Sequence, residues 1–426
     1  MWGIIRAYSV PQKHLLPLCS FCPVSSPTTP PPDAVVRKFE IAAIQKDLIY
    51  NRFGDHDPEG LIFVPLEQVK DVMNGRKKPI PLILRANAGD WIEVTLHNML
   101  DPDMPIRYND YPSVPLDLKH EPSNRVSLSP QFLKYDPIAS SGINVGYNAI
   151  EQTVAPGECI KYLWHADKEY GTVLLNSFGD LRNHRYHGLF GAIIIEPVGA
   201  NYYNSIRPVN ENYNEEAVIT APGVDTFREF VLFAHNGIRL LDKNGEIIKT
   251  TEQDLEDGAG GHGAPDHEDT GEKGYNYRSE RFFNRLKRVP LISKIFDSKI
   301  HGDPATPLLR SFVGERVIIR LLMPADKPRN ISFVLHGHNW KAQPDDPFTR
   351  TISVQGALSV GNVLNIEPEC ISKIGDYLYR SGSLRWDVES GMWGIYRVTN
   401  HNLRYRCEAT CRKVKQWWEE KWYDKI

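Results

Sequence analysis

The chain has 426 residues, of which 41% are hydrophobic and 24% are charged, and its formal net charge is −3. This near-neutral balance excludes the basic footprint of a nucleic-acid-binding protein. The sequence has no run of 18 apolar residues, so no transmembrane segment is expected, and the length suits two or three globular domains.

The N-terminal segment, residues 1–35, combines a repeated motif with a linker. Its opening, MWGIIRAY at 1–8, matches MWGIYRV at 392–398, which has the pattern of a final strand. A folding unit does not begin with its own last strand, so we expect 1–35 to be the remnant of an upstream repeat followed by a linker rich in Pro and Ser. Charged residues and prolines interrupt its apolar positions, so no signal peptide is predicted and the compartment stays open.

Residues 36–200 form the first predicted unit. Alternating apolar and polar residues predict strands, which Gly, Pro, Asn and Asp clusters separate. The strands expected here are 38–44, 90–98, 159–166 and 191–197.

Residues 201–404 form the second predicted unit, again with many short strands and few helical periods. The strands expected here are 229–235, 314–322, 330–340, 351–356 and 394–398. An acidic, Gly-rich run at 251–273 is expected to be a surface loop. The whole pattern predicts an all-β protein built from β-sandwiches.

The two units contain an internal repeat. PLILRANAGDWIEVTL at 81–96 corresponds to PLLRSFVGERVIIRL at 307–321, each with an Arg, then a Gly, then an acidic residue before an apolar strand. HGLFGAIIIEP at 187–197 and SGMWGIYRV at 390–398 close the two copies. A repeat of this size indicates a tandem architecture.

The C-terminal residues 405–426 predict a short helix, which docks on the body or attaches to a partner or a membrane surface. Both terminal segments carry paired cysteines, Cys19 with Cys22 and Cys407 with Cys411. Four thiolates suit zinc if the termini meet, and otherwise the pairs are free thiols. Six cysteines in this length do not form a disulfide framework.

Five segments carry a family pattern: VSLSPQFLKYD (126–136), GYNAIEQTVAPGECIKYLWHADKEYGT (146–172), NHRYHGLFGAIIIEP (183–197), FVLHGHNW (333–340) and GDYLYRSGSLRWDVESGMWGIYRV (375–398). Together they resemble the multicopper oxidases, in particular large bacterial copper oxidases that repeat the cupredoxin β-sandwich. The resemblance covers roughly residues 36–400. It implies two tandem cupredoxin-like Greek-key β-sandwiches, followed by the short C-terminal helix.

The resemblance also implies where copper ligands should stand. The family's type-1 copper takes a Cys thiolate and two His, often with a weak axial Met. In the first unit, the place of His-Cys-His falls near 176–178, and the trailing His is retained as His184. In the second unit, 380–382 (Arg-Ser-Gly) occupies that neighbourhood, Asp387 stands where the trailing His belongs, and Met392 is retained.

The histidine signature of the family, His-Pro-x-His-Leu-His-Gly-His, reads ISFVLHGH here. The type-1 His has become Ile331 and another copper His has become Val334. His336 matches a ligand of the family's three-copper cluster, and His338 matches a position that usually does not bind copper. The first His-x-His pair of the family reads Ser-Pro-Gln at 129–131.

A residual metal site is the remaining possibility for the histidines. His336 and His338 are one residue apart on a predicted strand, so both are expected to face the same side. A further ligand could come from His184, His187 or His235. His184, His187, His336 and His338 are therefore the candidates for a residual copper site, and packed or hydrogen-bonded histidines are the alternative.

No other catalytic arrangement competes in the sequence. It contains no nucleophile elbow, no P-loop and no dinucleotide-binding fingerprint after a strand. In place of a metal, we expect Arg380 to form an ion pair with Asp387 or Glu389.

Two interpretations follow. In the first, the chain is a non-catalytic structural or interaction part of a larger oxidase, or a truncated product, and its partners are other cupredoxin domains or an upstream chain. In the second, it is a copper-dependent oxidoreductase that oxidises metal ions or phenols with dioxygen, completed by a partner chain that supplies the missing Cys and His. Copper is a possible cofactor, at a residual site, and otherwise none is expected.

Overall fold

The computed structural model describes residues 29–103, 122–181, 183–203, 213–248, 271–325, 330–344, 346–369 and 373–400. The predicted terminal helix, the upstream-repeat motif and both cysteine pairs lie outside these residues. Within the described part of the chain, no helix is long and apolar enough to span a membrane.

The first half consists of two facing sheets. The five-stranded sheet has the order β4-β1-β6-β9-β8 and the four-stranded sheet has the order β5-β11-β10-β7. Their bounds are β1 Val36–Gln45, β4 Leu61–Pro65, β5 Leu82–Asn87, β6 Trp91–Asn98, β7 Ser129–Pro130, β8 Lys134–Tyr135, β9 Cys159–His165, β10 Gly171–Asn176 and β11 Phe190–Glu196. Alternate residues of these strands fill the space between the sheets and include Phe63, Val94, Trp164 and Ile193.

The second half also has two sheets. One has the order β12-β13-β14-β17-β22, with β15 paired to β14, and the other has the order β16-β24-β23-β18-β21. Their bounds are β12 Asn201–Tyr203, β13 Glu216–Ala221, β14 Val224–Ile238, β15 Glu272–Tyr275, β16 Leu309–Phe312, β17 Val317–Leu322, β18 Ile331–Leu335, β21 Val354–Leu358, β22 Val363–Ile366, β23 Gly375–Ser381 and β24 Trp393–Thr399. Their core includes Phe230, Ile319, Phe333, Tyr379 and Tyr396.

Equivalent strands pair in the same sense in both halves. β1 runs parallel to β6 and β5 parallel to β11, just as β14 runs parallel to β17 and β16 parallel to β24. Gly89 and Gly314, with φ of +91° and +79°, turn the chain between β5 and β6 and between β16 and β17. A positive φ favours glycine because it has no Cβ, so the two glycines perform the same task at corresponding turns.

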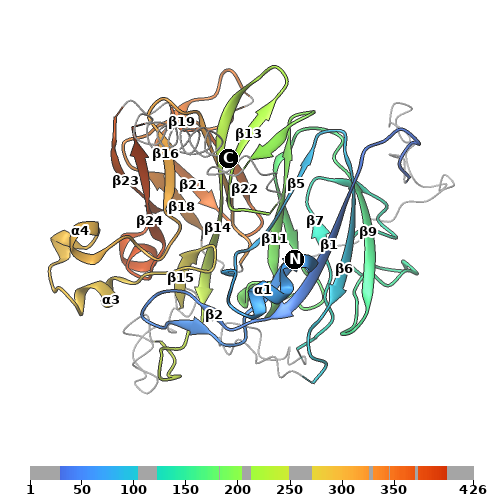
Figure 1. Ribbon diagram of the computed structural model, residues 1–426, viewed down its shortest axis with the longest axis horizontal. Helices are drawn as coiled ribbons and strands as arrows, with labels where there is room; N and C mark the ends of the chain where they lie inside the picture. The colour runs from blue at the N-terminus through green and yellow to red at the C-terminus, as the bar shows by residue number, and fades with distance from the viewer. Residues whose placement is uncertain are drawn as a thin grey trace, which may run out of the picture.

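Helices are short and lie outside the sheets. They are α1 Val69–Met73, α2 Asn183–Tyr186, α3 Phe282–Leu286 and α4 Ser298–His301, with 3₁₀ turns η1 Leu66–Gln68 and η4 Ile292–Lys294 and a π-helical turn η5 Leu384–Val388. Two-stranded sheets join β2 Leu48–Ile49 to β3 His56–Asp57 and β19 Trp340–Lys341 to β20 Thr351–Ile352. Figure 1 shows the two halves side by side, with α3 and α4 projecting from the second half.

The halves share a buried apolar contact. Strand β10 of the first half lies against β17 and β22 of the second. A continuous cluster of buried side chains crosses between them and includes Ile62, Ile83, Phe190, Phe233 and Leu322. Burying this apolar surface favours a fixed arrangement of the two halves.

Candidate functional site

A serine–histidine pair lies at the end of β10 in the first half, and we call Ser177 with His184 the first closure. Ser177 follows directly after β10, and its Oγ lies 2.9 Å from Nδ1 of His184, which is fully buried in α2. Nε2 of His184 lies 2.9 Å from the carbonyl oxygen of Ser123. Because a carbonyl oxygen only accepts hydrogen bonds, Nε2 carries the proton and Nδ1 accepts from Ser177. Both ring nitrogens of His184 are therefore engaged.

The second half has a corresponding pair with different side chains, and we call Ser381 with Asp387 the second closure. Ser381 ends β23, and its Oγ donates to Oδ2 of Asp387 in η5. Nζ of Lys273, on β15, lies 3.9 Å from Oδ1 of Asp387. All three side chains are buried, so this half holds a hydroxyl, a carboxylate and an ammonium in one place.

The closures have matching backbones as well. The amide of Leu189 donates to the carbonyl oxygen of His184, and the amide of Met392 donates to that of Asp387. Gly188 and Gly391, one residue before Leu189 and Met392, have φ of +104° and +113°. In the second half, the positions that the sequence equates with the type-1 Cys, the trailing His and the axial Met lie together, since the amide of Ser381 also donates to the carbonyl oxygen of Met392. In the first half, Ser177 and Leu189 each bond His184.

Burial sets the protonation of these groups. It lowers the pKa of His184 to about 4, against an opposing effect of Asp180, so the ring is neutral near pH 7. It raises the pKa of Asp387, and Lys273 opposes that rise. The neutral imidazole of His184 has a hydrogen-bond partner at each nitrogen. Asp387 has Ser381 and Lys273 beside it. Both groups therefore have polar partners without a metal.

The prediction that His336 and His338 share one face of a strand is wrong. Strand β18 ends at Leu335, and Gly337, with φ of +74°, turns the chain between the two histidines. His336 is exposed, whereas His338 is buried and packs edge-on against Tyr377 at 4.6 Å. The glycine breaks the period-2 alternation on which the prediction relied.

The predicted ion pair of Arg380 with Asp387 or Glu389 is also wrong. Nε of Arg380 lies 2.8 Å from Nε2 of His336, and its Nη1 bonds the carbonyl oxygens of Ser381 and Gly382. Asp387 is held by Ser381 and Lys273 instead. Arg380 and Ser381 are successive residues of β23. Their side chains therefore point to opposite faces of the sheet, and only Ser381 faces Asp387.

His187 and His235 lie near the junction of the halves. Nδ1 of His187 is 2.9 Å from Oδ2 of Asp57 and its Nε2 is 3.9 Å from Oε2 of Glu59. His235 is fully buried edge-on against Phe190, with ring centroids 5.2 Å apart. Among the described residues, no group of three or more His, Cys, Asp and Glu side chains could hold a metal ion.

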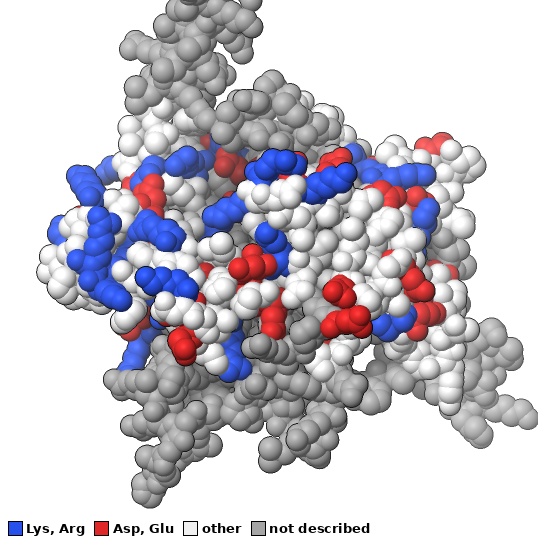
Figure 2. Space-filling view, turned by 60° about the horizontal axis from the view of Figure 1, so that its bottom comes forward, with Lys and Arg blue, Asp and Glu red and all other residues white. Residues whose placement is uncertain are grey.

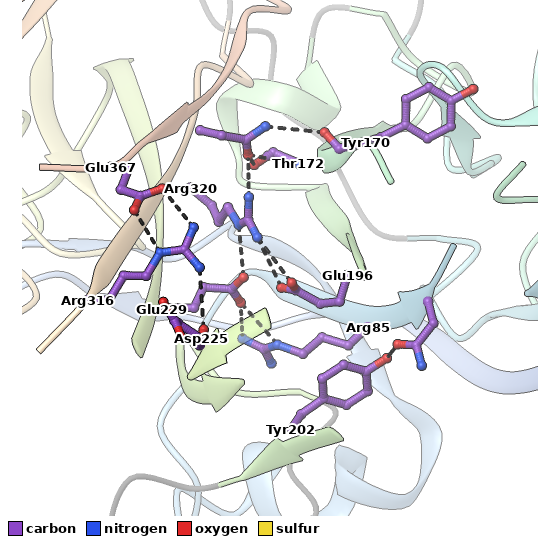
Figure 3. Close-up of polar contacts among 12 residues, drawn as sticks. Arg85, Tyr170, Thr172, Glu196, Tyr202, Asp225, Glu229, Arg316, Arg320 and Glu367 are labelled. Atoms are coloured by element: carbon purple, nitrogen blue, oxygen red, sulfur yellow. Dashed lines mark hydrogen bonds and ion pairs between the residues drawn. The ribbon is translucent and has the colours of Figure 1, made fainter. Parts of the chain in front are cut away.

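A buried ion cluster joins the two halves and was not predicted from the sequence. Arg85 and Glu196 come from β5 and β11, and Glu229 and Arg320 come from β14 and β17 (Figure 3). The four side chains are at most 4% exposed. The sequence does contain a hint of this cluster, because each of the four charged residues lies within or beside a run of apolar residues typical of a buried strand.

Glu229 is the centre of this cluster. Its Oε1 accepts from Nη2 of Arg85 at 2.8 Å, and its Oε2 accepts from Nε of Arg320 at 2.9 Å. Arg320 also donates to both carboxylate oxygens of Glu196 at 3.2 Å. Burial would raise the pKa of Glu229, but the two guanidinium groups hold it below its ordinary value, whereas burial and the Glu229 charge raise that of Glu196.

Replacement of His235 by leucine is expected to reduce the acid sensitivity of the fold. Burial, with a smaller effect of His187, lowers the pKa of His235 to about 3. Below about pH 6.5, His235 therefore binds a proton in the unfolded chain but not in the folded chain. The free energy of unfolding falls as the pH drops from about 6.5 toward about 3. His235→Leu should remove up to about 1.4 kcal/mol per pH unit from this slope. Urea unfolding midpoints across this window measure it, and an unchanged slope would contradict it.

Gly391→Ala is expected to destabilise the second closure by about 2–5 kcal/mol. A Cβ there would lie 2.0 Å from Oγ of Ser279 and 2.6 Å from the carbonyl oxygen of Lys273, on a backbone with φ of +113°. Gly314→Ala is the matched control, because its φ is +79° but no atom lies within 4 Å of the added Cβ. It should cost only about 1–2 kcal/mol. Equal losses in denaturant unfolding would show that the contacts at Gly391 are unimportant.

Comparison with known proteins shows the fold. No protein-family model matches the chain, and no curated protein sequence matches it. A solved multicopper oxidase matches with a TM-score of 0.50 and 18% identity, over 88% of this chain and 94% of that one. A copper nitrite reductase from Nitrosomonas europaea matches with a TM-score of 0.48 and 18% identity, over 86% and 95%. The first likeness confirms the predicted fold, two tandem cupredoxin-like β-sandwiches.

Proposed function

We propose that the chain is a cupredoxin-fold relative of the copper oxidases whose type-1 positions are filled by side chains that bond one another. It serves as a non-catalytic structural or interaction part of a larger oxidase, beside other cupredoxin domains. We also propose residues 36–200 and 201–404 as its two repeated domains. The observation that carries the proposal is the pair of matching closures, Ser177 with His184 and Ser381 with Asp387.

The chemistry of the two closures supports this proposal. A type-1 centre needs a thiolate, and serine supplies a hydroxyl that is a poor ligand for copper. In the first half, a metal would have to displace a hydrogen bond from each nitrogen that it used on His184. In the second half, the Lys273 ammonium stands beside Asp387 and would repel a copper cation.

The remaining histidines support it in the same way. Arg380 donates to Nε2 of His336 at 2.8 Å, so the lone pair that copper would use is occupied. Nδ1 of His338 faces the carbonyl oxygen of His336 at 2.8 Å and therefore carries a proton. Copper on Nε2 of His336 or on either ring nitrogen of His184 would have to break one of these bonds. Nε2 of His338 keeps its lone pair, but among the described residues neither His338 nor His187 belongs to a group of three or more His, Cys, Asp and Glu side chains that could hold a metal ion.

Copper loading followed by oxygen-uptake measurement tests the proposal. The purified chain is incubated with Cu²⁺, freed of excess metal, and assayed with a phenol and with Fe²⁺ as electron donors. We expect a colourless protein and no oxygen uptake above the copper-free sample. An intense blue absorption, which marks a thiolate–copper centre, together with donor-dependent oxygen uptake would favour a copper-dependent oxidoreductase instead.

A further inference from the structure

A lobe at the side of the second half carries an unusual surface. We call residues 281–301, which include α3, η4 and α4, the α3–α4 lobe. It contains six Lys and Arg residues and one acidic residue, Asp297. In Figure 1 it projects from the body of the molecule, beyond β23 and β24.

Large apolar side chains of the lobe face solvent. Phe283 is 61% exposed, Leu291 is 48% exposed and Ile292 is 59% exposed. Leu384, in the neighbouring turn η5, is 57% exposed. Single exposed apolar residues are common, but several on one projection indicate a contact surface.

The cations of the lobe divide into two groups. Arg281 and Arg285 point inward, where they pair with Glu272 and Glu280. The outward group lies among the exposed apolar side chains and consists of Lys287, Arg288, Lys294 and Lys299. Figure 2 shows Lys and Arg gathered over this end of the molecule. The exposed surface of the lobe is therefore both basic and apolar.

A hollow of about 550 Å³ continues this surface. Phe283 and Ile292 line it together with Arg385 of η5, which is exposed, and the carboxylates of Asp242, Glu246 and Glu389 line it as well. The basic and apolar groups thus extend from the lobe onto the turn that carries Asp387.

We propose that the α3–α4 lobe docks on an anionic lipid surface. Lipid headgroups supply the negative charge that Lys287, Arg288, Lys294 and Lys299 complement, and the headgroup–acyl boundary accepts Phe283, Leu291 and Ile292. An acidic peptide fits this surface less well, because the hollow beside the lobe that would hold it is lined by the carboxylates of Asp242, Glu246 and Glu389, and like charges repel. This inference does not depend on the copper content of the protein.

Vesicle co-sedimentation of the full chain tests the proposal. The probes are vesicles of phosphatidylglycerol with phosphatidylcholine and vesicles of phosphatidylcholine alone. We expect sedimentation with the anionic vesicles only, weakened between about 0.1 M and about 1 M salt, since salt screens the charges. Lys287→Glu with Arg288→Glu, and separately Phe283→Ser with Ile292→Ser, should each lower partitioning at least about tenfold.

The control is Lys168→Glu with Lys341→Glu, which makes the same change of charge at exposed sites outside the lobe. Circular dichroism melts establish that every variant is folded. A wild-type chain that stays in the supernatant with anionic vesicles would overturn the proposal. Binding that the control reduces as strongly as the lobe variants do would also overturn it, because net charge alone would then explain the effect.

Discussion

Glu229→Ala is expected to lower the free energy of unfolding by about 3–5 kcal/mol, because it leaves two buried guanidinium groups without their shared carboxylate. Arg85 and Arg320 both bond Glu229 through buried side chains, so water cannot replace the lost carboxylate. Since the cluster joins β5 and β11 to β14 and β17, the loss should weaken the contact between the halves. Urea unfolding measures the change.

A matched surface pair provides the control for this result. Arg316 and Glu367 are linked at 2.7 Å, but their side chains are 35% and 40% exposed. Glu367→Ala should therefore cost less than about 1 kcal/mol. The double variant Arg85→Met with Glu229→Leu should cost less than the sum of its single changes, since both members of one pair leave together. A loss below about 1 kcal/mol for Glu229→Ala would show that the cluster does not hold the halves.

Placing the ligand types of a type-1 copper centre in the second half is expected to create a copper site there. The variant combines Ile331→His, Ser381→Cys and Asp387→His with the native Met392, and Lys273→Met removes the competing ammonium. We chose these positions because Ser381 donates to Asp387 through its hydroxyl and to the carbonyl oxygen of Met392 through its amide, so these three residues lie close together. A thiolate, two imidazoles and a thioether then suit copper.

The expected readout is about one copper per chain with an intense thiolate-to-copper absorption. Ser381→Cys alone is the control, and it should stay colourless because it lacks both imidazoles. Keeping Lys273 in the combined variant should weaken copper binding, since its ammonium lies beside the new ligand at 387. A folded combined variant that binds no copper would show that these positions do not form one site.

Local patterns predicted most of the strands. The runs at 38–44, 90–98 and 191–197 correspond to β1, β6 and β11 within one or two residues, because alternating or continuous apolar residues identify buried strands. Strand β14 extends beyond the predicted 229–235 because its outer part pairs with β13 and β15. The pairing with β15, more than thirty residues further along the chain, leaves no local signal.

The polar interior was harder to predict. The exchange of ligand types around Ser381 and Asp387 is visible in the sequence, but the ammonium of Lys273 reaches them from a strand more than a hundred residues earlier. Arg380 turns to His336 and not to the nearby acids because strand alternation sends it to the other face. Sequence spacing does not contain the first of these contacts, whereas the second follows once the strand and its two faces are known.

X-ray absorption at the copper edge, on the isolated chain loaded with copper, tests the central claim most directly. The sample carries serine at Cys19, Cys22, Cys407 and Cys411, so that the terminal thiols contribute no sulfur ligand. The filled closures at Ser177 and Ser381 predict no stoichiometric copper and no copper–sulfur scattering. One copper per chain with a sulfur ligand and histidine nitrogens would contradict the account.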